Sequence, residues 1–407
     1  MITYFCLQFS AIIIIFAGNI PYIIEYLMPH KSDIKQECLS PHPGAVLLGE
    51  LSEHDMSQRE LAVAIGKTPA VINGIIKGER DINSDIALLL EAALPGPLKA
   101  EDWMRMQCAY DLDRMRGQSE LEKRRSDIMT WGIMKALLKL KILKKKLDFT
   151  DDIGKNIALV FDALGVSSLD EFQQKVSSFQ RRVCFKKSDK VATDSVNLMT
   201  WLVIVRHKSN SQRLEVPFHR EAIPHLKSLL NQVIFENSDT FARTEELCNQ
   251  YGIKFIRESK LDKVPVDGYS FWMGDNPTIV MTGRMDRIDN FAFTLMHELG
   301  HIELHLTKDS NDDFVDIDPG SSAHNKDVRE SQATSYATES IWQGEDLYDV
   351  FWNIQNPFGA APILKSVARR RRMNPGVVVG QYRHFCMEHQ LVRNPYAICH
   401  ELIERVN

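Results

Sequence analysis

The sequence of 407 residues lacks paired cysteines, internal repeats and a strong excess of charge of one sign. Its seven cysteines are scattered without a C-x-x-C pair, which argues against both a disulfide framework and a cysteine-based zinc site. We therefore expect reduced thiols in a cytoplasmic protein. The net charge of −5 argues against a wholly basic protein that coats nucleic acid, although it allows a local DNA-binding face.

The N-terminal segment 1–39 is an apolar extension without lysine or arginine ahead of its apolar run. The run is long enough to span a membrane, but it lacks the basic start of a signal peptide. Gly18 and Pro21 also interrupt it. We expect that translation starts at Met28 and that residues 1–27 are upstream sequence read in frame, so a membrane partner is not expected. The alternative is a genuine membrane anchor.

The next region carries the signals of two short helices joined by a tight turn. Ser57 and Glu60 have the spacing of a capping box, and Gly66 ends the first helix. Thr68 can cap the second helix, and Pro69 takes its first position, where a missing N–H costs nothing. The apolar residues expected to line the two helices are Leu61, Ala62, Ile65, Val71, Ile72, Ile75 and Ile76.

Such a helix-turn-helix unit inserts its second helix into the major groove of DNA, while the first helix crosses the phosphates. The alternative is a helical hairpin that only dimerises, because Ala70 and Gly74 offer no hydrogen bond to a base edge. The residues expected to contact DNA are Gln58 at the backbone and, around the second helix, Lys67, Thr68, Asn73 and Lys77.

The stretch "HPGAVLLGELSEHDMSQRELAVAIGKTPAVINGIIKGERDINSDIALLLEAAL", followed by "WMRMQCAYDL", resembles the HigA-type antitoxins, which are XRE or lambda-repressor-like helix-turn-helix proteins. The resemblance covers residues 42–115 and includes the flanking "HPG" and "W-x-x-x-Q-x-x-Y" patterns. It implies a small all-α domain that binds a palindromic operator as a homodimer.

Later in the chain, the segment "FTLMHELGHIELHL" at 293–306 places His297 and His301 four residues apart in an apolar helical pattern. Residues four apart share one helix face, so both imidazoles can bind one metal ion. Glu298 can take a proton from water activated by that ion, as in H-E-x-x-H zinc peptidases. Asp289 is a candidate N-cap. The alternative is a buried helix with hydrogen-bonded histidines, which is costly unless they are paired or metallated.

A catalytic zinc site needs a third protein ligand and an open position for water. Glu303 follows His301 by two residues and points away from its face, whereas His305 could extend that face. A ligand from a separate helix makes a better tetrahedron, and the segment 327–342 supplies Glu330. The spacing alone leaves these candidates open.

A pair of strands is predicted ahead of this helix, at Tyr269–Gly274 and Pro277–Thr282, separated by the turn residues Asp275 and Asn276. An edge strand beside a zinc helix can align an extended peptide through backbone hydrogen bonds. The strands therefore favour a peptide as the substrate.

The pattern "FTLMHELGHIELH" followed by "E-x-Q-A-x-x-Y-A" resembles the ImmA/IrrE family of metallopeptidases, from about residue 236 to 345. The resemblance implies Zn²⁺ as the cofactor and assigns the roles as follows: His297, His301 and Glu330 as metal ligands, and Glu298 as the catalytic general base. It looks continuous with a subset that fuses a HigA-like domain to the peptidase. Thr334 departs from the family pattern, which has Asn or Asp there.

Together these features imply a DNA-binding regulator whose zinc metallo-endopeptidase domain cleaves a repressor or antitoxin. The alternative, motivated by Thr334, is an antitoxin-like DNA-binding protein that binds a cognate toxin and whose zinc domain is a sensor or scaffold without turnover. The expected fold is multi-domain: the apolar extension 1–39, an all-α lambda-repressor-like helix-turn-helix domain at 40–115, a helical middle region at 116–235, and an α+β zincin-like metallopeptidase domain at 236–407.

Overall fold

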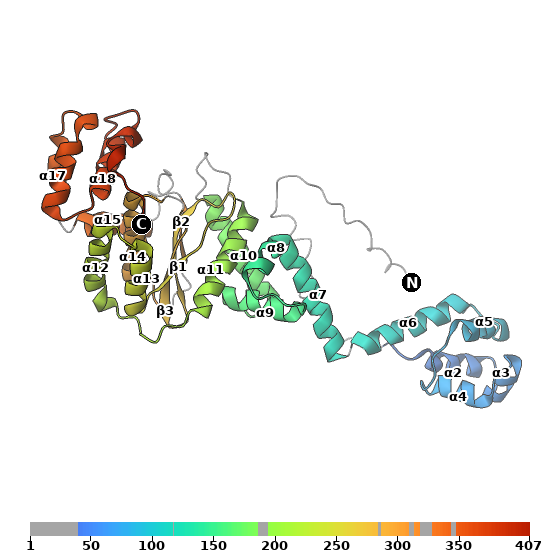
Figure 1. Ribbon diagram of the computed structural model, residues 1–407. Helices are drawn as coiled ribbons and strands as arrows, with labels where there is room; N and C mark the ends of the chain where they lie inside the picture. Colours follow the sequence, from blue (N-terminus) through green and yellow to red (C-terminus); the bar gives the residue numbers. More distant parts are fainter. Residues whose placement is uncertain are drawn as a thin grey trace. The chain divides into compact units, whose positions relative to one another are not determined.

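The computed structural model describes residues 40–116, 118–185, 194–283, 286–308, 313–317, 328–342 and 347–407. The expectations for the segment 1–39 lie outside these residues. Between Lys123 and Arg124 the chain divides into two compact units, so it is multi-domain as predicted (Figure 1). Among the described helices, none combines the length and the apolar character that a membrane span requires.

In the residues that the structure describes, the first unit is all-α as predicted. Its helices are α2 (Pro43–Glu53), α3 (Gln58–Ala64), α4 (Pro69–Ile76), α5 (Ser84–Ala93) and α6 (Ala100–Arg116). The predicted capping box starts α3, because Ser57 Oγ accepts from the Glu60 N–H at 3.2 Å and the Glu60 carboxylate accepts from the Ser57 N–H at 2.8 Å. Thr68 stands at the N-cap of α4, but its hydroxyl makes no capping bond. The position of the cap is therefore confirmed, but the Val71 N–H bonds to the Thr68 carbonyl in place of the hydroxyl.

The apolar residues predicted for α3 and α4 form the core of this unit. Leu61, Ala62, Ile65, Ile72 and Ile75 are buried, and Val71 and Ile76 are half-buried against them. Both helices end before glycines in the left-handed region, which favours glycine because it has no Cβ. These are Gly66 (φ 63°) and Gly78 (φ 71°).

The flanking "HPG" pattern locks α2 against α4 and α6. His42 caps α2 by accepting from the Gly44 N–H at 3.0 Å, and its ring meets Tyr110 edge-on at a centroid distance of 4.8 Å. A Cβ on Gly44 would lie 1.9 Å from the carbonyl oxygen of Ile75, so only glycine allows this approach. Buried Gln107 accepts a backbone N–H from the segment before α5 at 3.0 Å. These flanking residues therefore serve the fold of the unit.

The second unit, which starts within α7 (Ser119–Leu137), is built around a four-stranded sheet formed by the described residues. The strands are β1 (Lys254–Arg257), β2 (Val266–Met273), β3 (Asn276–Met281) and β4 (Asp313–Ile317), in the order β1-β3-β2-β4. β1 runs parallel to β3, and the other pairs are antiparallel. The predicted β2–β3 pair occupies the middle of the sheet, and β4 is the outer strand beside β2.

The β2–β3 turn differs by one residue from the prediction. It is formed by Gly274 and Asp275, and Asn276 already pairs with Met273 in the ladder. Gly274 has a φ of 66°, a conformation that two-residue hairpin turns require and that glycine adopts readily. The dipeptide that marks this turn in the sequence is therefore Gly274–Asp275, and not Asp275–Asn276.

Helices cover both faces of this sheet (Figure 1). The core on one side is formed with α7, α8 (Leu140–Lys146), α9 (Ile153–Leu164), α10 (Leu169–Phe185) and α11 (Ser195–Ser211). The core on the other side is formed with α12 (Ile223–Glu236), α13 (Thr240–Gln250), α14 (Ile288–Leu304), α15 (Val328–Trp342), α16 (Tyr348–Trp352), α17 (Ala361–Arg371) and α18 (Pro375–Glu388). Neighbouring strand residues alternate between the two cores, with Ile279 in one and Val280 in the other.

The middle region is helical as predicted, and its helices pack on the sheet. Trp201 of α11 is fully buried, with its ring centroid 6.1 Å from that of Tyr269 on β2. α14 lies on the opposite face. Arg287, rather than the expected Asp289, is its N-cap. Asp289 instead lies in the first turn, where its charge suits the helix dipole and it accepts from Arg287 at 3.0 Å.

Candidate metal centre and nucleic-acid interface

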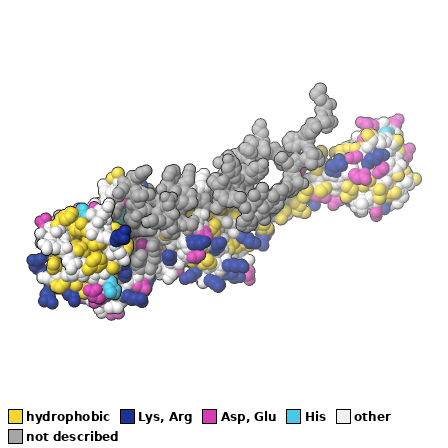
Figure 2. All heavy atoms as spheres, turned by 90° about the horizontal axis from the view of Figure 1, so that it is seen from above, with side chains coloured by type: hydrophobic (Ala, Val, Ile, Leu, Met, Phe, Trp, Pro, Cys, Tyr) yellow, Lys and Arg dark blue, Asp and Glu magenta, His cyan; other side chains and the backbone are white. Residues whose placement is uncertain are grey.

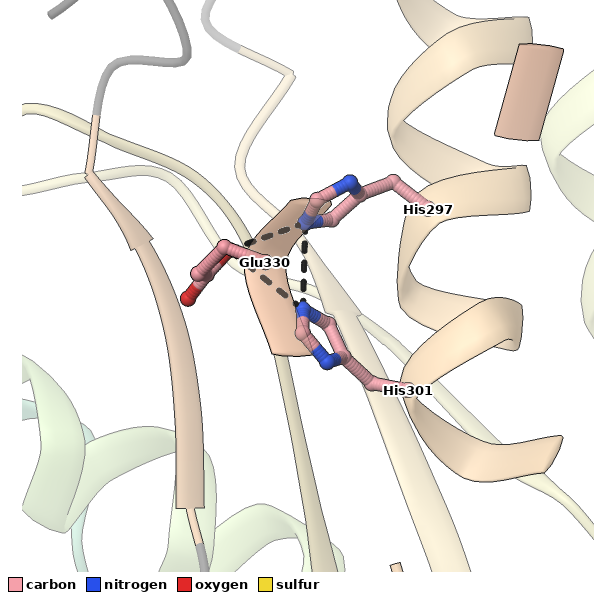
Figure 3. A group of neighbouring side chains, drawn as sticks. All are labelled: His297, His301 and Glu330. Atoms are coloured by element: carbon pink, nitrogen blue, oxygen red, sulfur yellow. Dashed lines mark hydrogen bonds and ion pairs between the residues drawn. The ribbon is translucent and has the colours of Figure 1, made fainter. Parts of the chain in front are cut away.

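Three side chains from two helices converge beside the sheet (Figure 3). The Nε2 atoms of His297 and His301, one turn apart on α14, are 3.1 Å apart. The carboxylate of Glu330, in the first turn of α15, lies 3.3 Å from the first of these atoms and 3.5 Å from the second. All three residues are at most 2% exposed. The structure thus brings together the three residues that the resemblance assigns as ligands.

The spacing of these atoms fits a tetrahedral zinc ion. Ligand atoms about 2.0–2.1 Å from such an ion lie about 3.3–3.4 Å from one another, which matches the observed separations. Two histidine nitrogens and one carboxylate oxygen are also a known donor set of catalytic zinc sites. Burial lowers the pKa of His301 to about 4, outweighing the Glu330 carboxylate, which raises it. His301 therefore stays neutral near pH 7, as a metal ligand must.

Close packing of α14 against α15 places Glu330. A Cβ on Gly300 would lie 2.8 Å from the ring of Tyr336, so glycine lets the tyrosine reach the helix backbone. Ala333 and Ala337 are fully buried. The Tyr336 hydroxyl donates to Glu303, so this candidate third ligand is engaged away from the centre. The small and aromatic residues in the two motifs therefore set the distance between the helices.

His305, the other candidate third ligand, lies behind His301. Its Nδ1 is 3.2 Å from the Nδ1 of His301, the ring nitrogen that does not face Glu330. Its Nε2 is 2.9 Å from the amide oxygen of Gln332 on α15. Gln332 is the glutamine of the pattern "E-x-Q-A-x-x-Y-A", but its contact with His305 could not be predicted without the packing of the two helices.

Glu298, the expected general base, is fully buried between α14 and β2. A Cβ built on Gly268 would lie 2.3 Å from Glu298 Oε1 and 2.8 Å from its Cγ. The carboxylate therefore lies directly over this strand position, and the strand can accommodate it because residue 268 is glycine. Gly268 was not among the residues predicted from the sequence.

His297, the other candidate ligand, has a different environment. The ring of Phe293 stacks on that of His297 at a centroid distance of 6.0 Å. Among the described residues, none makes a hydrogen bond with Nδ1 of His297. Thr334, the departure from the family pattern, lies one turn after Glu330, and its carbonyl accepts from the Thr338 hydroxyl at 3.1 Å.

The residues expected to contact DNA all remain at the surface of the first unit. Gln58 and Asn73 are partly exposed, and Lys67, Thr68 and Lys77 are exposed. Basic and acidic side chains are interspersed over the face of this unit that Figure 2 shows. On that face, the positive charges are therefore not gathered into one broad basic surface.

Two family models match separate parts of the chain. A helix-turn-helix model matches residues 51–99, and a model of the IrrE N-terminal-like domain matches residues 248–349. Over 79 residues the chain is 39% identical to Virulence-associated protein I of Dichelobacter nodosus, covering 19% of this chain and 71% of that protein. A solved addiction module antidote protein of the HigA family from Coxiella burnetii is 29% identical, with 22% of this chain and 95% of that chain covered and a TM-score of 0.20.

Proposed function

We propose that this chain, which belongs to the XRE-like helix-turn-helix family and carries an IrrE-like domain, is a transcriptional regulator of the toxin–antitoxin type with a zinc metallo-endopeptidase domain. The first unit binds operator DNA as a homodimer. The second unit cleaves a repressor or antitoxin. The near-tetrahedral spacing of the nitrogens of His297 and His301 and the carboxylate of Glu330 carries the enzymatic part of this proposal.

The described residues can perform peptide hydrolysis with the following division of labour. When bound, zinc supplies a Lewis acid that activates water and polarises the scissile carbonyl. Glu298 accepts the proton of the attacking water and returns it to the leaving nitrogen as the C–N bond breaks. Because residue 268 is glycine, β2 leaves room for that carboxylate. β4, the outer strand beside β2, offers a backbone edge for an extended segment of the substrate.

In the DNA-binding part of the proposal, the two lysines supply affinity and the neighbouring polar residues supply selectivity. Lys67 and Lys77 each neutralise a phosphate, so replacing either lowers the slope of log affinity against log salt by about 0.9. Gln58 contacts the backbone, and Thr68 and Asn73 face the bases. Because Ala70 offers only a methyl group, base reading rests on few contacts.

A second function is supported by the environment of His297. A ligating histidine usually donates its other ring nitrogen to an acceptor, and such partners tune metal affinity. Among the described residues, Nδ1 of His297 has no such partner, and Thr334 replaces the Asn or Asp of the family pattern. The alternative is therefore an antitoxin-like DNA-binding protein that binds a cognate toxin. Its zinc domain then serves as a sensor or a scaffold and does not cleave a substrate.

Zinc analysis followed by a cleavage comparison tests the proposal. We expect about one zinc per chain in the wild type, and loss of zinc in His301→Ala and Glu330→Ala. New protein N-termini that appear in cells producing the wild type, but not in cells producing Glu298→Gln, identify the substrate. Zinc without any Glu298-dependent cleavage, together with toxin neutralisation by Glu298→Gln, favours the alternative. A wild type that binds no zinc after loading overturns both.

A gel-shift series tests the DNA-binding part separately. The wild type should retard its own promoter fragment, and Lys67→Ala and Lys77→Ala should weaken binding with a reduced salt slope. Arg105→Ala removes one positive charge from the exposed side of α6, outside the two helices expected to meet DNA, and provides a charge-matched control. Equal losses in all three variants would show a general charge effect instead of the assigned contacts.

A further inference from the structure

Behind the candidate metal centre, a series of hydrogen-bonding contacts through His305 connects His301 to the surface of α15. The Nδ1 atoms of His301 and His305 are 3.2 Å apart, and Nε2 of His305 is 2.9 Å from the amide oxygen of Gln332. His305 is half-buried and Gln332 is exposed. This series of contacts thus leads from a buried candidate ligand to a side chain in contact with solvent.

The donors and acceptors along this series of contacts follow from its outer end. An amide oxygen can only accept, so Nε2 of His305 carries the hydrogen. A neutral imidazole that donates from Nε2 accepts at Nδ1. The Nδ1 of His301 therefore donates to His305, which leaves a lone pair on Nε2 of His301. That atom faces Glu330 and the other candidate ligand, where a metal ion would lie.

We propose that Gln332 and His305 are positioning residues that fix His301 in the tautomer able to bind zinc. The inference rests on the proposed zinc site. Partners of this kind typically change metal affinity by about 10–100-fold when they are removed. The hydrogen-bonded series Gln332–His305–His301 is called the relay below. It matters here because Nδ1 of His297 has no partner among the described residues. Of the two candidate ligand histidines, the structure thus supports the orientation of one through its second nitrogen.

Substitutions at Gln332 can reverse the relay without filling the core. This residue lines a surface hollow of about 480 Å³, which has room for a longer side chain. The ammonium group of Gln332→Lys can only donate, which would place the hydrogen of His305 on Nδ1. Nδ1 of His301 would then accept, and its Nε2 would carry the hydrogen and lose the lone pair. Gln332→Glu can only accept and preserves the original order.

Zinc affinity, measured by competition with a chromogenic chelator, tests the relay. We expect Gln332→Lys to weaken zinc binding about 10–100-fold, and Gln332→Glu to bind at least as tightly as the wild type. Glu339→Gln raises the net charge by one in the same hollow and is expected to leave affinity unchanged. In a His305→Ala background the relay is cut, so Gln332→Lys should have no further effect. Thermal unfolding checks that each variant is folded.

Nitrogen NMR of His301 in the zinc-free protein gives a readout that does not depend on zinc. The wild type should carry its ring hydrogen on Nδ1, and Gln332→Lys should shift it to Nε2. Equal zinc affinity and an unchanged tautomer in Gln332→Lys would overturn the relay while leaving the proposed function intact. A wild type that binds no zinc, but shows the expected tautomer change, would overturn the proposed function and keep the relay.

Discussion

Replacing Gly300 with alanine has two opposite effects on stability, because alanine favours the helix but its Cβ collides with a neighbouring side chain. Gly300 lies within α14, where alanine is intrinsically favoured over glycine by about 0.5–1 kcal/mol. However, the added Cβ would lie 2.8, 3.1 and 3.2 Å from three atoms of Tyr336, closer than carbon atoms normally approach. The sign of the change in stability therefore depends on whether the tyrosine can move.

Contacts on both sides hold Tyr336 in place. Its hydroxyl donates to Glu303, and the ammonium nitrogen of Lys227 lies 4.7 Å from its ring centroid. Overpacking a well-packed contact costs about 1–3 kcal/mol, which exceeds the propensity gain. We expect Gly300→Ala to lower the free energy of unfolding by about 1–2 kcal/mol. Since each kcal/mol shifts Tm by about 2–4 °C in a unit of this size, Tm should fall by about 2–8 °C.

Calorimetry of the zinc-free protein measures this effect, with Gly132→Ala as the matched control. Gly132 is exposed within α7 of the same unit, and a Cβ there would have no neighbour within 4 Å. Alanine should stabilise that helix by about 0.5–1 kcal/mol. In a Tyr336→Ala background, Gly300→Ala should also become stabilising. A rise in Tm for Gly300→Ala alone, equal to that of Gly132→Ala, would refute the proposed packing of α15 on α14.

Four further outcomes are expected. Gly268→Ala should push the Glu298 carboxylate about 1 Å from its place and lower kcat/KM about 100-fold, while zinc analysis shows full loading. Gly44→Ala should collide with the α4 backbone, lower the Tm of the first unit and abolish the gel shift without loss of zinc. Thr334→Asn should raise zinc affinity in the chelator assay, because it restores the amide of the family pattern, and such groups next to a site support its ligands. Burial lowers the pKa of His301 in the folded protein to about 4, below its ordinary value near 6.5. Between pH 6.5 and pH 4 the unfolded chain therefore binds a proton at this histidine that the folded protein does not bind. The Tm of the zinc-free protein should therefore keep the full stabilisation from neutral His301 above pH 6.5 and lose it as the pH falls towards 4.

The helix-turn-helix could be predicted in detail because its signals are local. Ser57 and Glu60 lie within one turn of each other, so their capping box needs no tertiary partner. Gly66 and Gly78 mark helix ends through their own backbone conformation. The role of Gly44 could not be predicted in this way, because it depends on how closely α2 approaches α4.

The metal centre was only partly predictable from spacing. The four-residue interval places His297 and His301 on one face of any helix. The same rule left His305 as a candidate ligand, although it contacts His301 from behind. Choosing Glu330 requires the packing of α15, which depends on contacts made by residues far apart in the chain. The family resemblance supplied this candidate ligand because it carries such packing information.

The helices before residue 236 also contribute to the candidate site, although they carry none of its proposed ligands. β2 presents Gly268 to Glu298 on one face, while Tyr269 and Phe271 point into the core formed by α7 to α11 on the other. Successive residues of a strand face opposite sides, so displacing those aromatic rings would also move Gly268. The buried guanidinium of Arg206 on α11 lies 4.7 Å from the Phe271 ring centroid and donates to the Tyr269 hydroxyl at 3.1 Å. The position of the candidate general base therefore depends on the strand, and the strand depends on the middle helices.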